Sequence, residues 1–262
     1  MKQSQAKKRD NAMTNKILMG LIALVLGLLF LEILIVHSKN EQQKNASNQV
    51  QTARIMANGD LLYHDALYMS ALQADGSYDF TENFTYVKPW LKQADLVLGD
   101  FEGTVNPDYP LSGYPLFNAP QSVTAAIKDA GYDVMDLAHN HILDSGLEGA
   151  FTTADAFKKV GIDSVGVYEK PVRNKAPLLI KNVNGIKVAI LSYAYGYNGL
   201  ESNLTDKEVA DHLSNLDEKR MKAEIQRAEK EADITVIMPQ MGVEYRLEPT
   251  DEQVKLYHKM ID

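Results

Sequence analysis

Hydrophobic patterning divides the chain into one apolar block near its start and a longer region of short alternating periods. Residues 17–36 are apolar apart from one charged side chain, Glu32. A helix of this length spans roughly 30 Å, the thickness of a bilayer core. No small-residue cleavage pattern follows it, which favours a membrane anchor over a signal peptide. We therefore expect a transmembrane signal anchor at residues 17–37.

The segments on either side of this block predict an orientation. Residues 1–16 carry five basic side chains and one acidic one, so the amino terminus is expected to stay in the cytoplasm. Residues 38–51 are rich in Asn, Gln, Ser and Lys and have little to bury, which is typical of a flexible stalk. We expect a single-pass protein of the cell membrane whose domain, residues 52–262, faces the outside.

Within that domain, short apolar runs alternate with amphipathic segments, which predicts an α/β fold with a mixed sheet or a pair of sheets. Asn184-Gly185 separates two of the runs and predicts a hairpin. Strands are expected at residues 54–57, 95–101, 134–138, 163–167, 177–183, 186–193 and 234–238. Helices are expected at residues 61–72, 82–93, 121–130, 147–160, 209–232 (broken near Asn215) and 250–262. Residues 107–120 form a long loop that could be a substrate-facing flap.

The last expected helix begins with a capping box, Thr250 and Gln253. It runs to the last residue with no cap and no closing strand after it. We therefore expect the chain to be the amino-terminal portion of a longer protein, with an open sheet edge.

Charge and composition exclude some functions. The formal net charge is −8, and because residues 1–16 contribute +4, the rest of the chain carries −12. An acidic body argues against nucleic acid as a partner, since phosphates are held by Lys and Arg. There are no cysteines, which excludes disulfides and thiolate chemistry.

Polar side chains gather where three expected strands end. They are Asp60 and His64, Asp100 and Glu102, and Asn140 and His141. Side chains just past the carboxyl ends of strands line the ligand site of an α/β sheet. Because isolated charges are costly to desolvate, three such strand ends together favour a cluster of metal ligands. Oxygen and imidazole ligands suit Mn²⁺, Zn²⁺, Fe or Mg²⁺, and two such ions can activate a bridging hydroxide.

Each position also fits a structural role. Asn58-Gly59-Asp60 could be a plain turn, and Glu102 a solvated loop charge. His64 could hydrogen-bond within its own helix. The polar stretch after residue 138 could cap the next helix through Asp144 or Ser145.

Four ordered motifs resemble the capsule-synthesis CapA family, the poly-γ-glutamate synthesis proteins. The motifs are Asn58-Gly59-Asp60, Gly99-Asp100-Phe101-Glu102-Gly103, Ala138-His139-Asn140-His141 with Asp144 and Gly146, and Gly242-Val243-Glu244-Tyr245. The resemblance runs from about Arg54 to the end. It implies a fold similar to calcineurin-like metallophosphoesterases, with two central sheets flanked by helices. It also implies a role in making, exporting or anchoring polyglutamate capsule beside membrane synthase subunits, as in Gram-positive bacteria.

The resemblance implies a set of site residues. Candidate metal ligands are Asp60, Asp100, Glu102, Asn140, His141 and Gln240; candidate catalytic residues are His141 and Asp144; candidate substrate-binding residues are His64, His139, Glu244 and Tyr245. Two departures stand out. Gln240 replaces a family histidine, and an amide is a far weaker ligand for Zn²⁺ or Mn²⁺ than imidazole. A later Gly-His-x-His segment of the family would lie beyond Asp262.

Three functions are compatible with these features, and they leave catalysis open. One is a membrane-anchored accessory of capsule assembly that binds or processes polyglutamate. The others are a surface metal-dependent hydrolase of a phosphoester or an amide, and an inactive scaffold for synthase subunits. Gln240 favours the scaffold over the hydrolase, whereas Asp60, Glu102 and His141 favour the other two. An acidic domain and a polyanionic polymer repel each other unless cations bridge them, and this favours a metal ion at the site.

Overall fold

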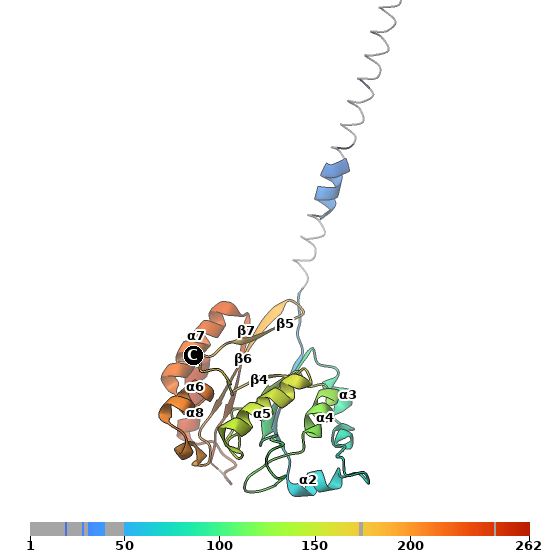
Figure 1. Ribbon diagram of the computed structural model, residues 1–262. Helices are drawn as coiled ribbons and strands as arrows, with labels where there is room; N and C mark the ends of the chain where they lie inside the picture. The colour runs from blue at the N-terminus through green and yellow to red at the C-terminus, as the bar shows by residue number, and fades with distance from the viewer. Residues whose placement is uncertain (1–18, 20–27, 29–30, 40–49, 173–174, 244) are drawn as a thin grey trace, which may run out of the picture. The chain divides into compact units, whose positions relative to one another are not determined.

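The computed structural model describes residues 19, 28, 31–39, 50–172, 175–243 and 245–262. The chain divides into two compact units, Met1–Gln51 and Thr52–Asp262. In the first unit, residues 31–39 are helical (Figure 1). The predicted basic tail, most of the predicted anchor at 17–37 and most of the predicted stalk lie outside the described residues. Among the helices that the structure does describe, none is long and apolar enough to cross a bilayer.

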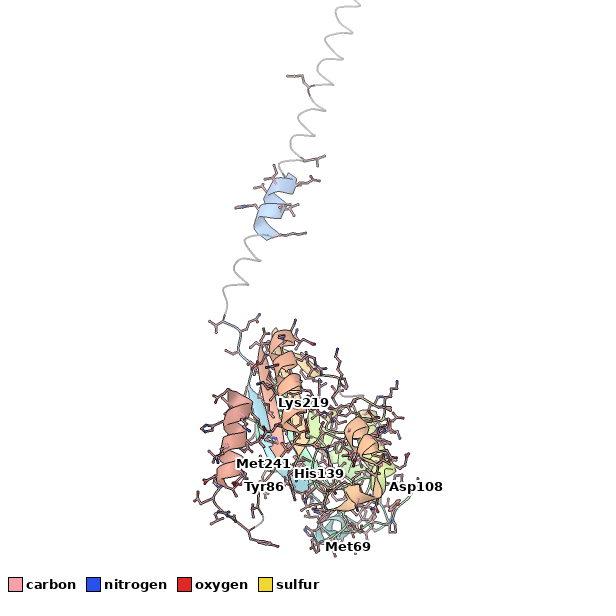
Figure 2. The ribbon with its side chains drawn as sticks, turned by 90° about the vertical axis from the view of Figure 1, so that its left-hand side faces the viewer. Met69, Tyr86, Asp108, His139, Lys219 and Met241 are labelled. Atoms are coloured by element: carbon pink, nitrogen blue, oxygen red, sulfur yellow. The ribbon has the colours of Figure 1, made fainter. Side chains whose placement is uncertain are left out.

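The second unit contains two sheets in its described part. The first is parallel, with the order β1 (Ile55–Leu62), β2 (Leu96–Glu102), β3 (Val134–Asp136) and β4 (Asp163–Val165). In the second, β5 (Leu179–Val183) is antiparallel to β6 (Ile186–Ala194), which is parallel to β7 (Ile234–Gln240). His139, which follows β3, lies inside this unit (Figure 2). The predicted α/β fold with a pair of sheets is confirmed.

The two sheets pack face to face and are covered by helices on their outer faces. Leu98 and Val134 of the first sheet share one apolar cluster with Val188 and Ile190 of the second. Helices α4 (Ser122–Ala130) and α5 (Gly146–Lys159) cover the first sheet, and α7 (Glu218–Glu231) and α8 (Asp251–Ile261) cover the second (Figure 1). The result is a four-layer arrangement, with helices outside and sheets inside.

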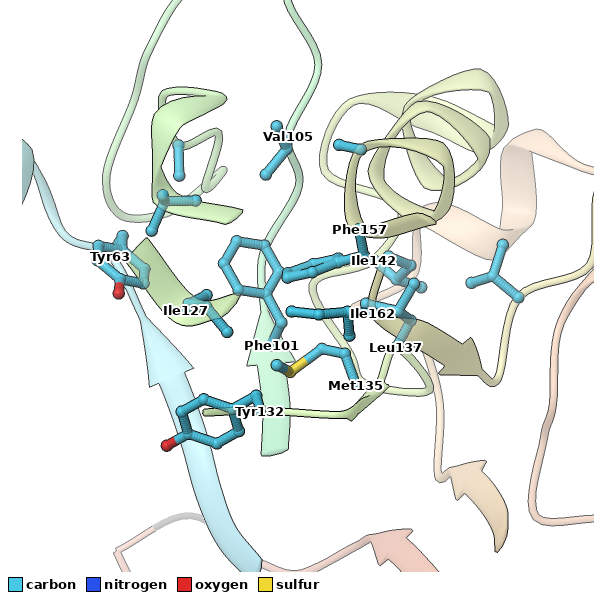
Figure 3. Close-up of a cluster of buried hydrophobic side chains, with 14 of the residues drawn as sticks. Tyr63, Phe101, Val105, Ile127, Tyr132, Met135, Leu137, Ile142, Phe157 and Ile162 are labelled. Atoms are coloured by element: carbon cyan, nitrogen blue, oxygen red, sulfur yellow. The ribbon is translucent and has the colours of Figure 1, made fainter. Parts of the chain in front are cut away.

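Aromatic packing fixes the first sheet against its helices. The ring of Phe101 on β2 meets that of Phe157 on α5 edge-on, with 5.1 Å between centroids (Figure 3). Ile127 of α4 and Met135 of β3 are fully buried in the same cluster. Because Phe101 directly precedes Glu102, this packing holds the carboxyl end of β2 in place.

Three predicted elements differ from the observed ones. The strand expected at 54–57 is longer, because β1 continues through Asn58-Gly59-Asp60 to Leu62 with a register shift between Ala57 and Asp60, and the alternative of a plain turn there is wrong. The helix expected at 61–72 is therefore shorter, α2 (Asp65–Ser70). The helix expected at 82–93 is two short pieces, η1 (Thr81–Phe84) and α3 (Lys88–Leu91). Pro89 lies at the start of α3, where a missing N–H is tolerated, and could not continue a helix from before it.

Other local predictions are confirmed. Asn184 and Gly185 both have positive φ, 54° and 89°, as a two-residue hairpin turn requires. The break near Asn215 separates α6 (Asp206–His212) from α7. Thr250 and Gln253 form the capping box at the start of α8.

Candidate functional site

The candidate site lies where the facing sides of the two sheets change from apolar to polar. Alternate residues of a strand share a face. Along β2, Leu96 and Leu98 belong to the apolar layer between the sheets, and Asp100 and Glu102 continue that face. The same change occurs from Val134 to Asp136 on β3, from Val188 and Ile190 to Ser192 on β6, and from Val236 and Met238 to Gln240 on β7.

Three carboxyl groups crowd together at this end of the first sheet. Asp60 pairs in register with Asp100, and its carboxyl group is within hydrogen-bonding range of both Asp100 and Glu102. Burial above all, together with the negative charges of Asp136, Asp60 and Glu102 and a hydrogen bond with Asp60, raises the pKa of Asp100 to about 10. Asp100 Oδ1 has no hydrogen-bond partner. These groups repel one another unless a proton or a cation lies between them.

Glu102 lies between this cluster and His141. Burial raises its pKa to about 7, and Asp60 adds to the shift while His141 opposes it. Glu102 Oε1 is 3.7 Å from His141 Nε2. Glu102 is buried rather than a solvated loop charge.

His141 and Asp144, the two candidate catalytic residues, form a buried pair. His141 Nδ1 is 2.8 Å from Asp144 Oδ2, which also accepts the backbone N–H of Phe117 at 2.6 Å. The Phe117 ring lies perpendicular to the His141 ring and to the His64 ring, with centroid distances of 4.8 Å to each. Phe117 thereby ties the predicted flap, residues 107–120, to His141, and the exposed His64 packs against the same Phe117 ring.

His139 supports the loop from inside. It is fully buried, its Nδ1 accepts the backbone N–H of His141 at 3.1 Å, and burial lowers the pKa of its ring to about 3. The ring is therefore neutral and supports the His141 backbone, and its contact with a substrate stays a prediction.

Gln240 holds Asn140 with both ends of its amide. Its Oε1 accepts the Asn140 backbone N–H at 2.6 Å, and its Nε2 donates to Asn140 Oδ1 at 2.9 Å. The Asn140 Nδ2 group donates to Asn198 Oδ1 at 3.1 Å. Gln240, predicted as a ligand, thus contacts the site through Asn140. Of the two remaining predicted residues, Glu244 lies outside the described residues and Tyr245 is fully exposed.

Three residues at the site were not predicted. Asp136 accepts hydrogen bonds from the Ala138 N–H and from the Ser192 hydroxyl, which joins the two sheets. Burial raises the pKa of Asp136 to about 7. The alternation along β3 and β6 would have placed Asp136 and Ser192 on the facing sides. For Asn198, which lies in the segment after β6, no sequence pattern gives a signal.

The donor set suits a hard divalent cation. Carboxylate and amide oxygens with one imidazole are ligands of Mg²⁺ and Mn²⁺, and the unpartnered Asp100 Oδ1 and the crowded carboxyl groups fit the approach of a cation. In the described residues, no group of three or more His, Asp or Glu side chains is already arranged around one point as ligands. The donor types of a cation site are therefore present among these candidate residues, without being gathered around one point.

Comparisons place the chain among capsule proteins. A family model described as bacterial capsule synthesis protein PGA_cap matches residues 54–262. Capsule biosynthesis protein CapA of Bacillus anthracis is 32% identical over 190 residues, which cover 68% of this chain and 45% of that protein. PGA biosynthesis protein CapA of Bacillus subtilis (strain 168) is 26% identical over 258 residues, which cover 97% of this chain and 66% of that protein.

Solved structures give a weaker likeness. Calcineurin-like phosphoesterase YfkN from Bacillus subtilis is 16% identical with a TM-score of 0.45, covering 75% of this chain and 64% of that chain. The chain spans between 45% and 66% of the length of the two capsule proteins named above.

Proposed function

The chain belongs to the family of bacterial capsule synthesis proteins described as PGA_cap, and on that premise we propose that it takes part in making, exporting or anchoring a capsular polymer. We take the polymer to be poly-γ-glutamate, the partners to be membrane synthase subunits, and the location to be the outer side of the cell membrane with residues 17–36 as the anchor. Matches to two CapA proteins support the capsule role.

The observation that carries a cation-dependent role is the crowding of Asp60, Asp100 and Glu102. Asp60 interacts through hydrogen bonds with both Asp100 and Glu102, Asp100 has an unpartnered oxygen, and a bound cation would stabilise the three carboxyl groups. These three residues would hold the ion, with Asn140 Oδ1 and His141 beside them. A bound divalent cation would supply a positive charge that attracts and polarises a carboxylate, phosphate or amide oxygen.

The chain's own residues would orient such a group and handle a proton. Asp144 holds His141 by Nδ1 and turns its Nε2 toward Glu102. A proton can be held or moved at His141 Nε2, and Phe117 shields one side of that ring from water. This pair favours hydrolysis of a phosphoester or an amide as the second candidate function. The engagement of Gln240 with Asn140 is compatible with the third, a scaffold without catalysis.

The test is metal binding by the purified full-length chain in detergent. Metal content is measured by mass spectrometry after incubation with Mn²⁺ or Zn²⁺, followed by Mn²⁺ titration of Asp60→Asn and Glu102→Gln. Asp163→Asn serves as the matched control, because Asp163 lies at the other end of the same sheet, where β4 begins, and pairs with Lys181. We expect about one or two ions per chain, lost in the two site variants and retained in the control.

Folded protein without stoichiometric metal would overturn the cation site and leave the scaffold function. Labelled polyglutamate added with and without Mn²⁺ then tests the polymer itself. Binding that requires Mn²⁺ and is lost in Glu102→Gln supports the proposal, whereas metal-independent binding contradicts the bridging role of the cation. Release of phosphate or of glutamate by the metal-loaded chain, lost in His141→Gln, would favour the hydrolase.

A further inference from the structure

One flank of the second unit exposes a group of large side chains that the candidate site does not use. Trp90, the only tryptophan of the chain, is 65% exposed, while Tyr86 is 88% exposed and Val87 46%. Residues three and four apart lie on the same side of a helical turn, and the Trp90 backbone N–H donates to the Val87 carbonyl. The three side chains therefore share one side of the chain around α3. We call Tyr86, Val87 and Trp90 the aromatic face.

The core holds the same segment by its inner side. Phe84 is buried, and Leu91 packs against the apolar cluster to which Phe84 belongs. The segment is thus fixed in place while the rings of Tyr86 and Trp90 stay outside. Neighbouring exposed apolar side chains mark contact surfaces. Trp and Tyr are enriched at the level of lipid headgroups in particular, because each ring joins an apolar body to one polar group.

The aromatic face lies close to the point where the unit joins the preceding chain. Gln93, three residues after Trp90, accepts a hydrogen bond from the Arg54 guanidinium at 3.3 Å, and the Asp95 carboxylate accepts the Arg54 backbone N–H at 2.8 Å. Arg54 directly precedes β1, and residues 38–51 connect the unit to the predicted anchor. These 14 residues span at most about 50 Å. An anchor in the bilayer would therefore keep the aromatic face within reach of the lipid headgroups.

The charges around the aromatic face are compatible with a lipid surface. Residues 83–94 contain two basic side chains, Lys88 and Lys92, and no acidic one, although the chain after residue 16 carries −12. Lys88 pairs with Asp129, whose carboxylate also lies near Lys92. These three charges sum to +1, so this flank of an acidic unit is not repelled by the anionic lipids of a membrane.

We propose that the aromatic face is a membrane-contact surface, with the rings of Trp90 and Tyr86 among the lipid headgroups on the outer side of the membrane. The inference rests on the location given in the proposed function and goes beyond it by assigning the surface that touches the bilayer. Contact through this face would fix the orientation of the unit, and of its candidate site, relative to the membrane.

Trp90 is its own reporter, because no other tryptophan contributes to the fluorescence. The full-length chain is reconstituted in vesicles of phosphatidylcholine and phosphatidylglycerol, with and without a lipid that carries a nitroxide quencher on its headgroup. Flotation of the vesicles reports whether the chain is bound to the membrane. Iodide, added before the vesicles form so that it is present on both sides, reports whether Trp90 is open to water. We expect the nitroxide lipid to quench Trp90, and we expect Trp90 to be protected from iodide.

Substitutions beside the reporter test the face itself. The double variant Tyr86→Ser with Val87→Ser removes two of its three side chains and keeps Trp90, so most of the quenching by lipid should be lost. Met69→Ser is the matched control, because Met69 is 57% exposed on α2, which follows the opposite end of β1, and it should keep the quenching. Lys92→Gln should lower the ratio of lipid-contacting to water-exposed Trp90 about fivefold in these anionic vesicles, and leave it unchanged in phosphatidylcholine alone.

The outcomes separate this inference from the proposed function. Quenching by lipid that is lost in the double variant and kept in Met69→Ser supports the membrane-contact surface. A membrane-bound chain whose Trp90 is open to iodide and unquenched by lipid overturns it and leaves the anchor intact. Trp90 that is protected from iodide but unquenched by lipid overturns it in favour of contact between two copies of the chain. A chain that does not float with the vesicles overturns the predicted anchor, and this inference with it.

Discussion

Replacing Asp100 by Asn should stabilise the metal-free protein, although it removes a candidate ligand. At pH 7 an Asp100 side chain whose pKa is raised to about 10 is protonated in the folded state, whereas in the unfolded chain, with its ordinary pKa of 3.8, it is ionised. Taking up that proton on folding costs about 4 kcal/mol, from 1.36 kcal/mol per pKa unit. Because the neighbouring carboxyl groups titrate together, we expect Asp100→Asn to recover about 2–4 kcal/mol.

The raised pKa of Asp100 also determines how the free energy of unfolding changes with pH. Below pH 3.8 both states hold the proton and the penalty vanishes. As the pH rises from there toward 10, the folded state binds more protons than the unfolded state, so the free energy of unfolding falls with increasing pH. Glu102 and Asp136, with pKa values raised to about 7, add to the fall up to that pH. Asp100→Asn should reduce the slope by about 1.4 kcal/mol per pH unit, the contribution of one proton.

The assay is urea unfolding followed by circular dichroism, in the presence of a chelator, at pH values from about 5 to 8. Asp95→Asn is the control, because the pKa of Asp95 is shifted in the opposite direction. The Asp95 carboxylate accepts the Arg54 backbone N–H, which lowers its pKa. That variant should not be stabilised. Parallel pH profiles for the wild type and Asp100→Asn, or a loss of stability at neutral pH, would refute the picture of a crowded neutral carboxyl group.

Two further predictions concern the support of the site. Gly166→Ala should cost more than about 4 kcal/mol, because a Cβ there would lie 2.4 Å from the Ala138 nitrogen, whereas Gly161→Ala, with no atom within 4 Å, should cost only about 1 kcal/mol of left-handed strain. Equal losses in thermal unfolding would contradict the close approach. Ser192→Ala removes a donor from the buried Asp136 and should cost about 1–3 kcal/mol. The loss should grow as the pH rises through about 7, where Asp136 ionises, and a loss independent of pH would contradict that contact.

Elements with local causes could be predicted from the sequence. Asn184-Gly185 specifies its own hairpin turn through positive φ, and the Thr250 capping box specifies where α8 begins. The strand expected at 54–57 was too short, because pairing with β2 outweighs the turn propensity of Asn58-Gly59-Asp60, and a register shift between Ala57 and Asp60 accommodates the irregular pairing. The family, predicted from ordered motifs, is confirmed by the match over residues 54–262.

The site could be predicted from the sequence where its residues lie at or just after the carboxyl end of a strand, and strand alternation could also have placed Asp136 and Ser192. Asp60, Glu102 and His141 come from motifs whose spacing marks strand ends. Asn198 lies 57 residues after His141 in the chain. The two residues are adjacent only because the second sheet packs on the first. Tertiary packing of this kind leaves no local trace in the sequence.

The order of the two sheets along the chain sets a sequence of events during synthesis. The strands that carry the candidate ligands are finished by residue 165, and the second sheet begins at residue 179. Gln240 follows Asn140 by 100 residues. At about 5–20 residues per second, a growing chain adds Asn140 roughly 5–20 seconds before the Gln240 amide that clamps it. The candidate ligands of the first sheet therefore exist before Gln240, the residue that orients Asn140, has been added.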